Sequence, residues 1–183
     1  MVDPGVVSAM LPYFNERFGN PGNRSQVFGQ EASAATEQAR EQVAALIGAA
    51  AEEIVFTSGV TESDNLAVRG AARALAGRGR HVVTSAIEHP AVLEPCRTLE
   101  REGFEVTRVP VSADGLVSVD AVAGALRPET ILVSLMAASN EVGTLQPVAE
   151  VAALCRERRV VLHCDAVQAV ATYRWTSRPG AST

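Results

Sequence analysis

The residues that could do chemistry lie in four short polar segments, each directly after a run typical of a β-strand. The first, residues 58–63, reads Ser-Gly-Val-Thr-Glu-Ser and predicts a tight turn that opens a helix. The free N–H groups at a helix start bind anions, Gly59 permits a close approach, and the Thr61 hydroxyl can add a hydrogen bond. The alternative is an ordinary helix cap, which is the more frequent meaning of Gly-x-Thr at such a place. Alone, the segment predicts an anion site only weakly.

The other three segments offer an imidazole, two amides and a carboxylate. His89 follows the second strand and would lie at the sheet edge, although an isolated loop histidine is more often a surface residue. Asn140 stands in Ser-Asn-Glu-Val-Gly, where its amide could bind a ligand oxygen or only form a turn. Asp165 and Gln168 follow the last strand. A buried carboxylate there would keep a neighbouring ring nitrogen protonated, whereas a lone carboxylate at a strand end is commonly a helix cap.

Alternating strands and helices would bring these segments together. Apolar residues at helical spacing predict a helix at 31–48 that Gly48 ends. Single helices between successive strands imply right-handed crossovers, so the sequence predicts an α/β fold with a largely parallel sheet and helices on both faces. The apolar runs at 131–133 and 160–162 suit strands buried on both sides. The predicted strands are 54–57, 81–85, 104–109, 131–136 and 160–164, and the later helices are 61–75, 91–101, 119–126 with Ser118 as cap, and 148–158.

Composition excludes several other classes of protein. The 183 residues are 47% hydrophobic and 20% charged, which is typical of a soluble globular protein with one sizeable core. A net charge of -5 with scattered arginines argues against binding to nucleic acid or to an anionic membrane. No apolar run approaches the roughly 20 residues that span a bilayer and no signal peptide is visible, so we expect a cytoplasmic protein. Cys96, Cys155 and Cys164 lack metal-ligand spacing, and we expect no metal site and reduced thiols, most of them packed inside.

The order and spacing of the four polar segments are similar to those of one enzyme family. From about Val2 to Val170 the chain resembles the pyridoxal-phosphate (PLP) enzymes of the class-V aminotransferase type, which have fold type I, and among them the cysteine desulfurases. We regard the shared motifs as strong indications of common ancestry. They are Met-Leu-Pro-Tyr-Phe at 10–14, Gly-Asn-Pro at 19–21, Phe-Thr-Ser-Gly at 56–59, Thr-Glu-Ser at 61–63, Glu-His at 88–89, Leu-Glu-Arg-Glu-Gly-Phe-Glu-Val at 99–106, Asn-Glu-Val-Gly at 140–143 and Asp-Ala-Val-Gln at 165–168.

The resemblance implies a role for each residue of the site. The residues that would bind PLP are Val60, Thr61, His89, Asn140, Asp165 and Gln168. The first two would hold the phosphate, and His89 would stack on the pyridine ring and assist proton movement as the catalytic residue. Asn140 and Gln168 would contact the phenolic oxygen. Asp165 would pair with the protonated ring nitrogen and make the ring an electron sink.

The resemblance also implies a reaction and its partners. The complete family enzyme is a homodimer that converts L-cysteine to L-alanine. The sulfur passes through an enzyme persulfide to an acceptor or scaffold protein, for iron–sulfur cluster assembly or thiolation.

The sequence lacks the residue on which the family's chemistry depends. All 16 residues counted as lysine or arginine are arginines, so the chain has no lysine to hold PLP covalently. The resemblance stops after Val170, before the family's cofactor lysine and catalytic cysteine. We therefore predict a partial large domain at 1–170 and a tail at 171–183 that does not belong to the family. We hypothesise that the tail is translated out of frame, because a reading displaced by one base across Trp175 and Thr176 must give aspartate.

Three functional hypotheses follow. The chain is a member of the cysteine desulfurase family that is inactive alone, or another class-V PLP enzyme such as a selenocysteine lyase or an aminotransferase, or a non-catalytic module that retains cofactor or partner binding. With the last strands of the large domain absent, we expect an unpaired sheet edge, uncovered apolar surface and poor solubility of the isolated chain.

Overall fold

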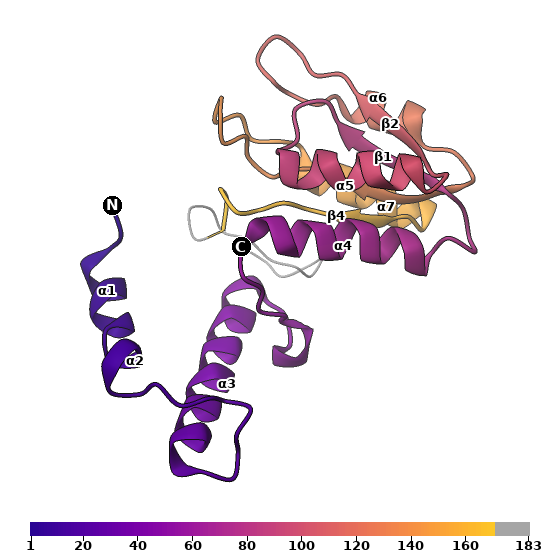
Figure 1. Cartoon of the computed structure of the whole chain (residues 1–183). Coiled ribbons are helices and arrows are strands. Elements are labelled where there is room, and N and C mark those ends of the chain that lie inside the picture. The colour runs from indigo at the N-terminus through magenta and orange to yellow at the C-terminus, as the bar shows by residue number, and fades with distance from the viewer. Residues whose placement is uncertain (171–183) are drawn as a thin grey trace. The chain divides into compact units, whose positions relative to one another are not determined.

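The computed structural model describes residues 1–170, so the predicted tail at 171–183 lies outside the described residues (Figure 1). Within them the chain forms two compact units, Met1–Val55 and a second unit that begins at Phe56. Each unit has its own secondary structure and is described by itself. No helix among residues 1–170 is long and apolar enough to cross a membrane.

The first unit is helical. It contains α1 (Pro4–Met10), α2 (Pro12–Asn15), α3 (Val27–Ile47) and the short 3₁₀ helix η1 (Ala51–Glu53). The sequence did not predict α1 and α2, although the Asp3 carboxylate caps α1 by accepting the Gly5 N–H at 2.7 Å and Pro4 opens the helix. α3 begins four residues before the predicted start and ends at Gly48, as predicted, where a φ of 69° requires the freedom of glycine.

The second unit is built around a four-stranded parallel sheet, which confirms the predicted fold class. Its strands are β1 (His81–Ser85), β2 (Glu105–Val109), β3 (Thr130–Ser134) and β4 (Val161–His163), in the spatial order β2-β1-β3-β4. All three strand pairs are parallel. The connecting helices are α4 (Val60–Ala74), which precedes β1, and α5 (Pro90–Arg101), α6 (Val119–Ala125) and α7 (Val148–Arg158).

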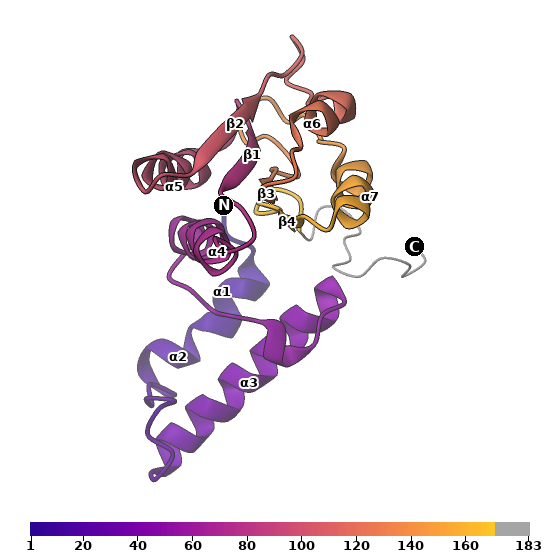
Figure 2. The same ribbon diagram turned by 90° about the vertical axis from the view of Figure 1, so that its right-hand side faces the viewer.

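Helices cover both faces of this sheet, as the sequence predicted. Figure 2 shows α4 and α5 on one side of the strands and α6 and α7 on the other. Two apolar clusters correspond to these layers: one joins Val68 of α4 and Leu99 of α5 to the sheet, and the other joins Val122 of α6 and Val151 of α7 to it. β1 and β3 are buried along their whole length, as expected for central strands of a parallel sheet.

Three local predictions were wrong. Residues 54–57 form no strand, because no strand among residues 1–170 pairs with them, and Val55 and Phe56 are exposed. β4 is not buried on both sides: it pairs only with β3 within the described residues, and Val161 is 40% exposed. Ser118 does occupy the N-cap position of α6, but its side chain makes no capping hydrogen bond.

Candidate functional site

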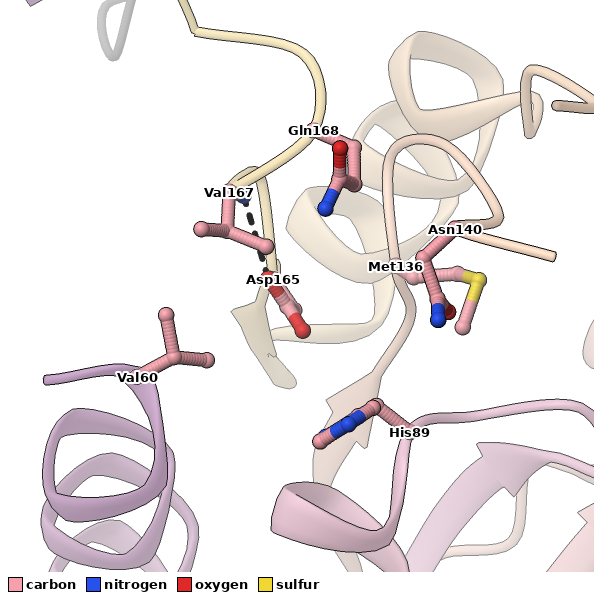
Figure 3. Close-up of a pocket in the computed structure, with 7 residues that line it drawn as sticks. All are labelled: Val60, His89, Met136, Asn140, Asp165, Val167 and Gln168. Atoms are coloured by element: carbon pink, nitrogen blue, oxygen red, sulfur yellow. Dashed lines mark hydrogen bonds between the residues drawn. The ribbon is translucent and has the colours of Figure 1, made fainter. Parts of the chain in front are cut away.

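A cavity of about 210 Å³ opens at the carboxyl ends of the strands in the second unit. Figure 3 shows the side chains that surround it, which come from the start of α4, the start of α5 and the segments after β3 and β4. The residues that line it are Val60, His89, Met136, Asn140, Asp165, Val167 and Gln168. The cavity thus brings together five of the six residues predicted to bind the cofactor. The sixth, Thr61, instead lines a separate surface depression along α4 with Ser58 and Glu62.

The Asp165 carboxylate is held at the cavity by backbone pairing that continues beyond β3 and β4. The Leu135 N–H donates to the His163 carbonyl at 3.0 Å and the Ala137 N–H to the Asp165 carbonyl at 2.8 Å. Asp165 is 8% exposed, and its Oδ1 accepts the Val167 N–H at 3.1 Å. The carboxylate therefore caps the following turn and also faces the cavity (Figure 3), while its predicted pairing with a ring nitrogen stays a prediction.

The His89 ring stands at the N-terminus of α5. Its Nδ1 accepts the Ala91 N–H at 3.1 Å, and Pro90 follows as the first helical residue. Because the Nδ1 lone pair is used in this bond, the neutral imidazole carries its proton on Nε2. The exposed ring thus offers an N–H donor and an aromatic face to the cavity.

The start of α4 has free donors for an anion. The Gly59 carbonyl accepts the N–H groups of Glu62 and Ser63 at 3.1 Å each, but no residue in the described range accepts those of Val60 and Thr61. Gly59 itself has φ 157° and ψ 178°, a conformation that essentially only glycine adopts. Glu62 folds back so that its Oε2 accepts the Ser58 N–H and hydroxyl, both at 2.6 Å. These bonds lower the pKa of the Glu62 carboxyl.

Asn140 and Gln168 complete the rim of the cavity. Asn140 lies in a tight hairpin in which the Ser139 N–H donates to the Thr144 carbonyl at 3.0 Å and the Gly143 N–H to the Ser139 carbonyl at 3.0 Å. Gln168 lies in the turn that Asp165 caps. Both side chains are exposed and line the cavity, so their amides are available to a ligand.

Sequence reasoning did not identify Met136 and Val167, which line the cavity, or the role of Glu88, which lies behind it. Met136 was predicted only as the last residue of a strand. Glu88 was noted only as the neighbour of His89. Burial raises the pKa of the Glu88 carboxyl to about 7, and the charge of Asp165 acts in the same direction.

Two of the three cysteines are packed inside, as the sequence predicted. Cys96 and Cys155 are buried, Cys164 is partly buried, and all three are free thiols. Burial raises the pKa of Cys96 and of Cys155 to about 11, and that of Cys164 to about 12. Within residues 1–170 no three histidine, cysteine or acidic side chains are grouped so that they could hold a metal ion.

Several known proteins are similar to this chain in sequence. A cysteine desulfurase, IscS, of Anaeromyxobacter sp. (strain K) is 54% identical over 169 residues, which are 92% of this chain and 42% of the relative. The mitochondrial cysteine desulfurase of Drosophila melanogaster is 52% identical over 169 residues, 92% of this chain and 37% of the relative. The chain thus spans about two fifths of the length of these relatives.

Solved structures give the same result. A NifS-like protein superposes with a TM-score of 0.91 at 38% identity, covering 96% of this chain and 48% of that protein. SspA in complex with cysteine superposes with a TM-score of 0.90 at 38% identity, covering 96% of this chain and 50% of SspA. The sequence pattern described as aminotransferase class-V matches residues 1–175. The chain is therefore a member of the class-V aminotransferase family.

Proposed function

We propose that the cavity binds PLP and that the chain carries the cofactor-recognition part of a cysteine desulfurase. One observation supports this proposal: a buried carboxylate, an aromatic N–H donor and free helix N–H groups lie around the same cavity. These groups come from Asp165, His89 and Val60. The similarity to cysteine desulfurases supports the choice of reaction within the family.

The residues of the cavity fit the chemistry of PLP group by group. A carboxylate beside a pyridine nitrogen favours the protonated form of that nitrogen, and Asp165 has the burial that makes such a pair strong. The flat imidazole of His89 offers a surface on which an aromatic ring can stack. The free N–H groups at the start of α4 suit a phosphate, and the amides of Asn140 and Gln168 suit a phenolic oxygen.

The chain's own residues would then hold and move protons at defined atoms. Asp165 would keep a proton on the ring nitrogen, and His89 would give or take one at Nε2, since its Nδ1 is occupied by the Ala91 N–H. Met136 and Val167 supply apolar walls that exclude water from the ring edge. Bound PLP supplies an electron sink for carbanions formed on an amino acid.

We propose L-cysteine as the substrate of the complete family enzyme, with sulfur passed to an acceptor or scaffold protein and with a homodimer as the working form. The similarity to cysteine desulfurases and the cysteine bound to SspA support the substrate class. The predicted cytoplasmic location remains a prediction, since similar relatives include proteins named as mitochondrial. The 183 residues contain no lysine, so we expect no sustained desulfuration by this chain alone.

The missing lysine also favours a second candidate function, a non-catalytic module that binds the cofactor or a partner. The two candidates share the same cavity and differ only in turnover. Sulfur release that appears when a separate polypeptide supplies the lysine would favour the enzyme, and PLP binding that no such polypeptide converts into turnover would favour the module.

Equilibrium dialysis with pyridoxine 5′-phosphate tests the cavity directly, because this molecule has an alcohol in place of the aldehyde and forms no covalent link. We expect saturable binding that Asp165→Asn weakens by about tenfold or more, since a hydrogen bond to a charged group contributes about 1.5–3 kcal/mol. The exposed Glu94→Gln on α5 serves as the control and should leave binding unchanged. Absence of saturable binding would refute the cofactor assignment. Sustained sulfide release from L-cysteine by the purified chain would refute the requirement for lysine.

A further inference from the structure

Glu88 is a buried acid that the proposed function has not used. It is 4% exposed and directly precedes His89 in the chain. Its Oε1 accepts two hydrogen bonds, from the Ser85 hydroxyl at 2.6 Å and from the Met136 N–H at 3.1 Å. Its Oε2 is buried and has no hydrogen-bond partner in the described part of the chain. A buried carboxyl with this asymmetry requires a physical explanation.

The two hydrogen bonds of Glu88 connect the ends of two strands at the cavity. Ser85 is the last residue of β1, and Met136 lies two residues beyond the end of β3. The next residue, Ala137, donates its N–H to the Asp165 carbonyl at 2.8 Å. Glu88 therefore binds the N–H of Met136, and the Asp165 carbonyl binds the N–H of the next residue, Ala137. The Met136 side chain lines the cavity.

Burial and the neighbouring Asp165 favour the neutral form of Glu88. Asp165 and Cys164 lie near it in the segment after β4, His163 in β4 and Cys96 in α5. Burial is the main reason that the pKa of Glu88 rises to about 7, and Asp165 adds to the rise. The hydrogen bonds from Ser85 and Met136 and the charge of His163 act in the opposite direction.

The hydrogen-bond pattern matches a protonated acid. The carbonyl oxygen of a neutral carboxyl accepts hydrogen bonds, and its hydroxyl oxygen carries the proton. With Oε1 as the carbonyl oxygen, both observed bonds are made, and a proton on Oε2 removes a buried negative charge at the cost of one hydroxyl donor that has no acceptor in the described part of the chain.

We propose that Glu88 is a positioning residue that, as a neutral acid, fixes the segment at Met136 and Ala137 beside Asp165. This proposal rests on the proposed function only for the identity of the ligand, since Asp165 is taken to face the ring nitrogen of PLP. The role differs from simple packing, because it predicts that the proton on Glu88 responds to the charge on Asp165.

Three variants of the full chain test the positioning role with pyridoxine 5′-phosphate in equilibrium dialysis. Glu88→Gln keeps a neutral carbonyl oxygen and should bind within about twofold of the unmodified chain. Glu88→Ala removes both hydrogen bonds and should weaken binding about fivefold or more. The control Glu94→Gln, at an exposed position on α5, should change nothing. Equal binding by the alanine variant, or equal losses in the alanine and glutamine variants, would refute the positioning role.

Carbon-13 NMR of glutamate carboxyls tests the proton without any ligand. One resonance should titrate near pH 7, disappear in Glu88→Gln and shift its midpoint to lower pH in Asp165→Asn. A Glu88 resonance that titrates with the exposed glutamates, or that ignores the Asp165 substitution, would refute the proposal. If no chain binds pyridoxine 5′-phosphate, the proposed function fails, while this titration still decides the state of Glu88.

Discussion

Replacement of Glu88 by glutamine should change how the stability of the chain depends on pH. The pKa of this carboxyl is about 7 in the folded chain against 4.5 for an ordinary glutamate, mainly because of burial. In the unfolded chain Glu88 is ionised above about pH 4.5, but in the folded chain it keeps its proton up to about pH 7. The ionisation of Glu88 therefore costs no stability below about pH 4.5. The cost grows as the pH rises from about 4.5 to about 7.

The expected loss of unfolding free energy follows from the pKa values of Glu88 in the folded and the unfolded chain. At about 1.4 kcal/mol for each pH unit, the displacement from 4.5 to about 7 corresponds to about 3.5 kcal/mol of unfolding free energy well above pH 7. Glutamine cannot ionise, so the unfolding free energy of Glu88→Gln does not decrease with pH for this reason. The NH₂ group of the glutamine takes the place of Oε2, which has no hydrogen-bond partner among residues 1–170. This exchange changes the unfolding free energy by an amount that does not depend on pH.

Urea unfolding followed by circular dichroism between about pH 5 and about pH 8 measures the effect. The stability of the variant relative to the unmodified chain should rise by about 2.5 kcal/mol from about pH 5 to about pH 8, and Glu94→Gln, at an exposed position, serves as the control. The reasoning is refuted if the difference between Glu88→Gln and the unmodified chain stays constant within about 0.5 kcal/mol.

Four further outcomes are expected. Val60→Pro removes one free N–H at a helix position that tolerates proline, so it should weaken pyridoxine 5′-phosphate binding about tenfold, whereas Val60→Ala should bind normally in the same dialysis assay. His163→Ala removes the partner of Ser134 at 2.9 Å and of Asp64 at 3.5 Å and should lower the unfolding free energy by about 2 kcal/mol in urea titrations; no loss would contradict a structural role. Cys155, with a pKa of about 11, should react with iodoacetamide only after unfolding, which mass spectrometry can detect. The isolated chain should associate through its exposed apolar side chains, and a monomeric, cooperative melt in light scattering and calorimetry would contradict this.

The sequence predicted the sheet well where apolar runs were flanked by clear helix signals. The residues predicted for β1 and α7 coincide with the observed elements. Residues 54–57 have the same apolar character but form no strand. Strand propensity becomes structure only when a neighbouring strand supplies hydrogen bonds, and a local pattern does not report on neighbours.

The sequence could predict which residues lie at the site where the topology of the sheet alone determines their position. The carboxyl ends of parallel strands meet at one edge, so His89, Asn140 and Asp165 could be expected to lie together before their distances were known. Thr61 shows the limit of this reasoning. Successive helical side chains point about 100° apart, so Val60 faces the cavity while Thr61 lines a different depression.

Glu88 could not be identified in this way, because its importance depends on the direction of one side chain. A glutamate in a loop is usually solvated, and nothing in Ile-Glu-His-Pro indicates that this carboxyl turns inward to Ser85. The inward orientation follows from the position of Met136, which is 48 residues away and offers its N–H at 3.1 Å. Only the assembled sheet brings these two groups together.

The proposed recognition of the cofactor does not use the residue type that would attach the cofactor covalently. The bonds that orient the cavity, from Ala137 to Asp165, from Ala91 to His89 and from Met136 to Glu88, all lie within the second unit. None of them involves a lysine. We expect a pocket organised in this way to bind a ring and a phosphate when no amine is available to hold the aldehyde. Family membership therefore follows from residues that are present, whereas the proposed turnover would require a residue type that the 183 residues do not contain.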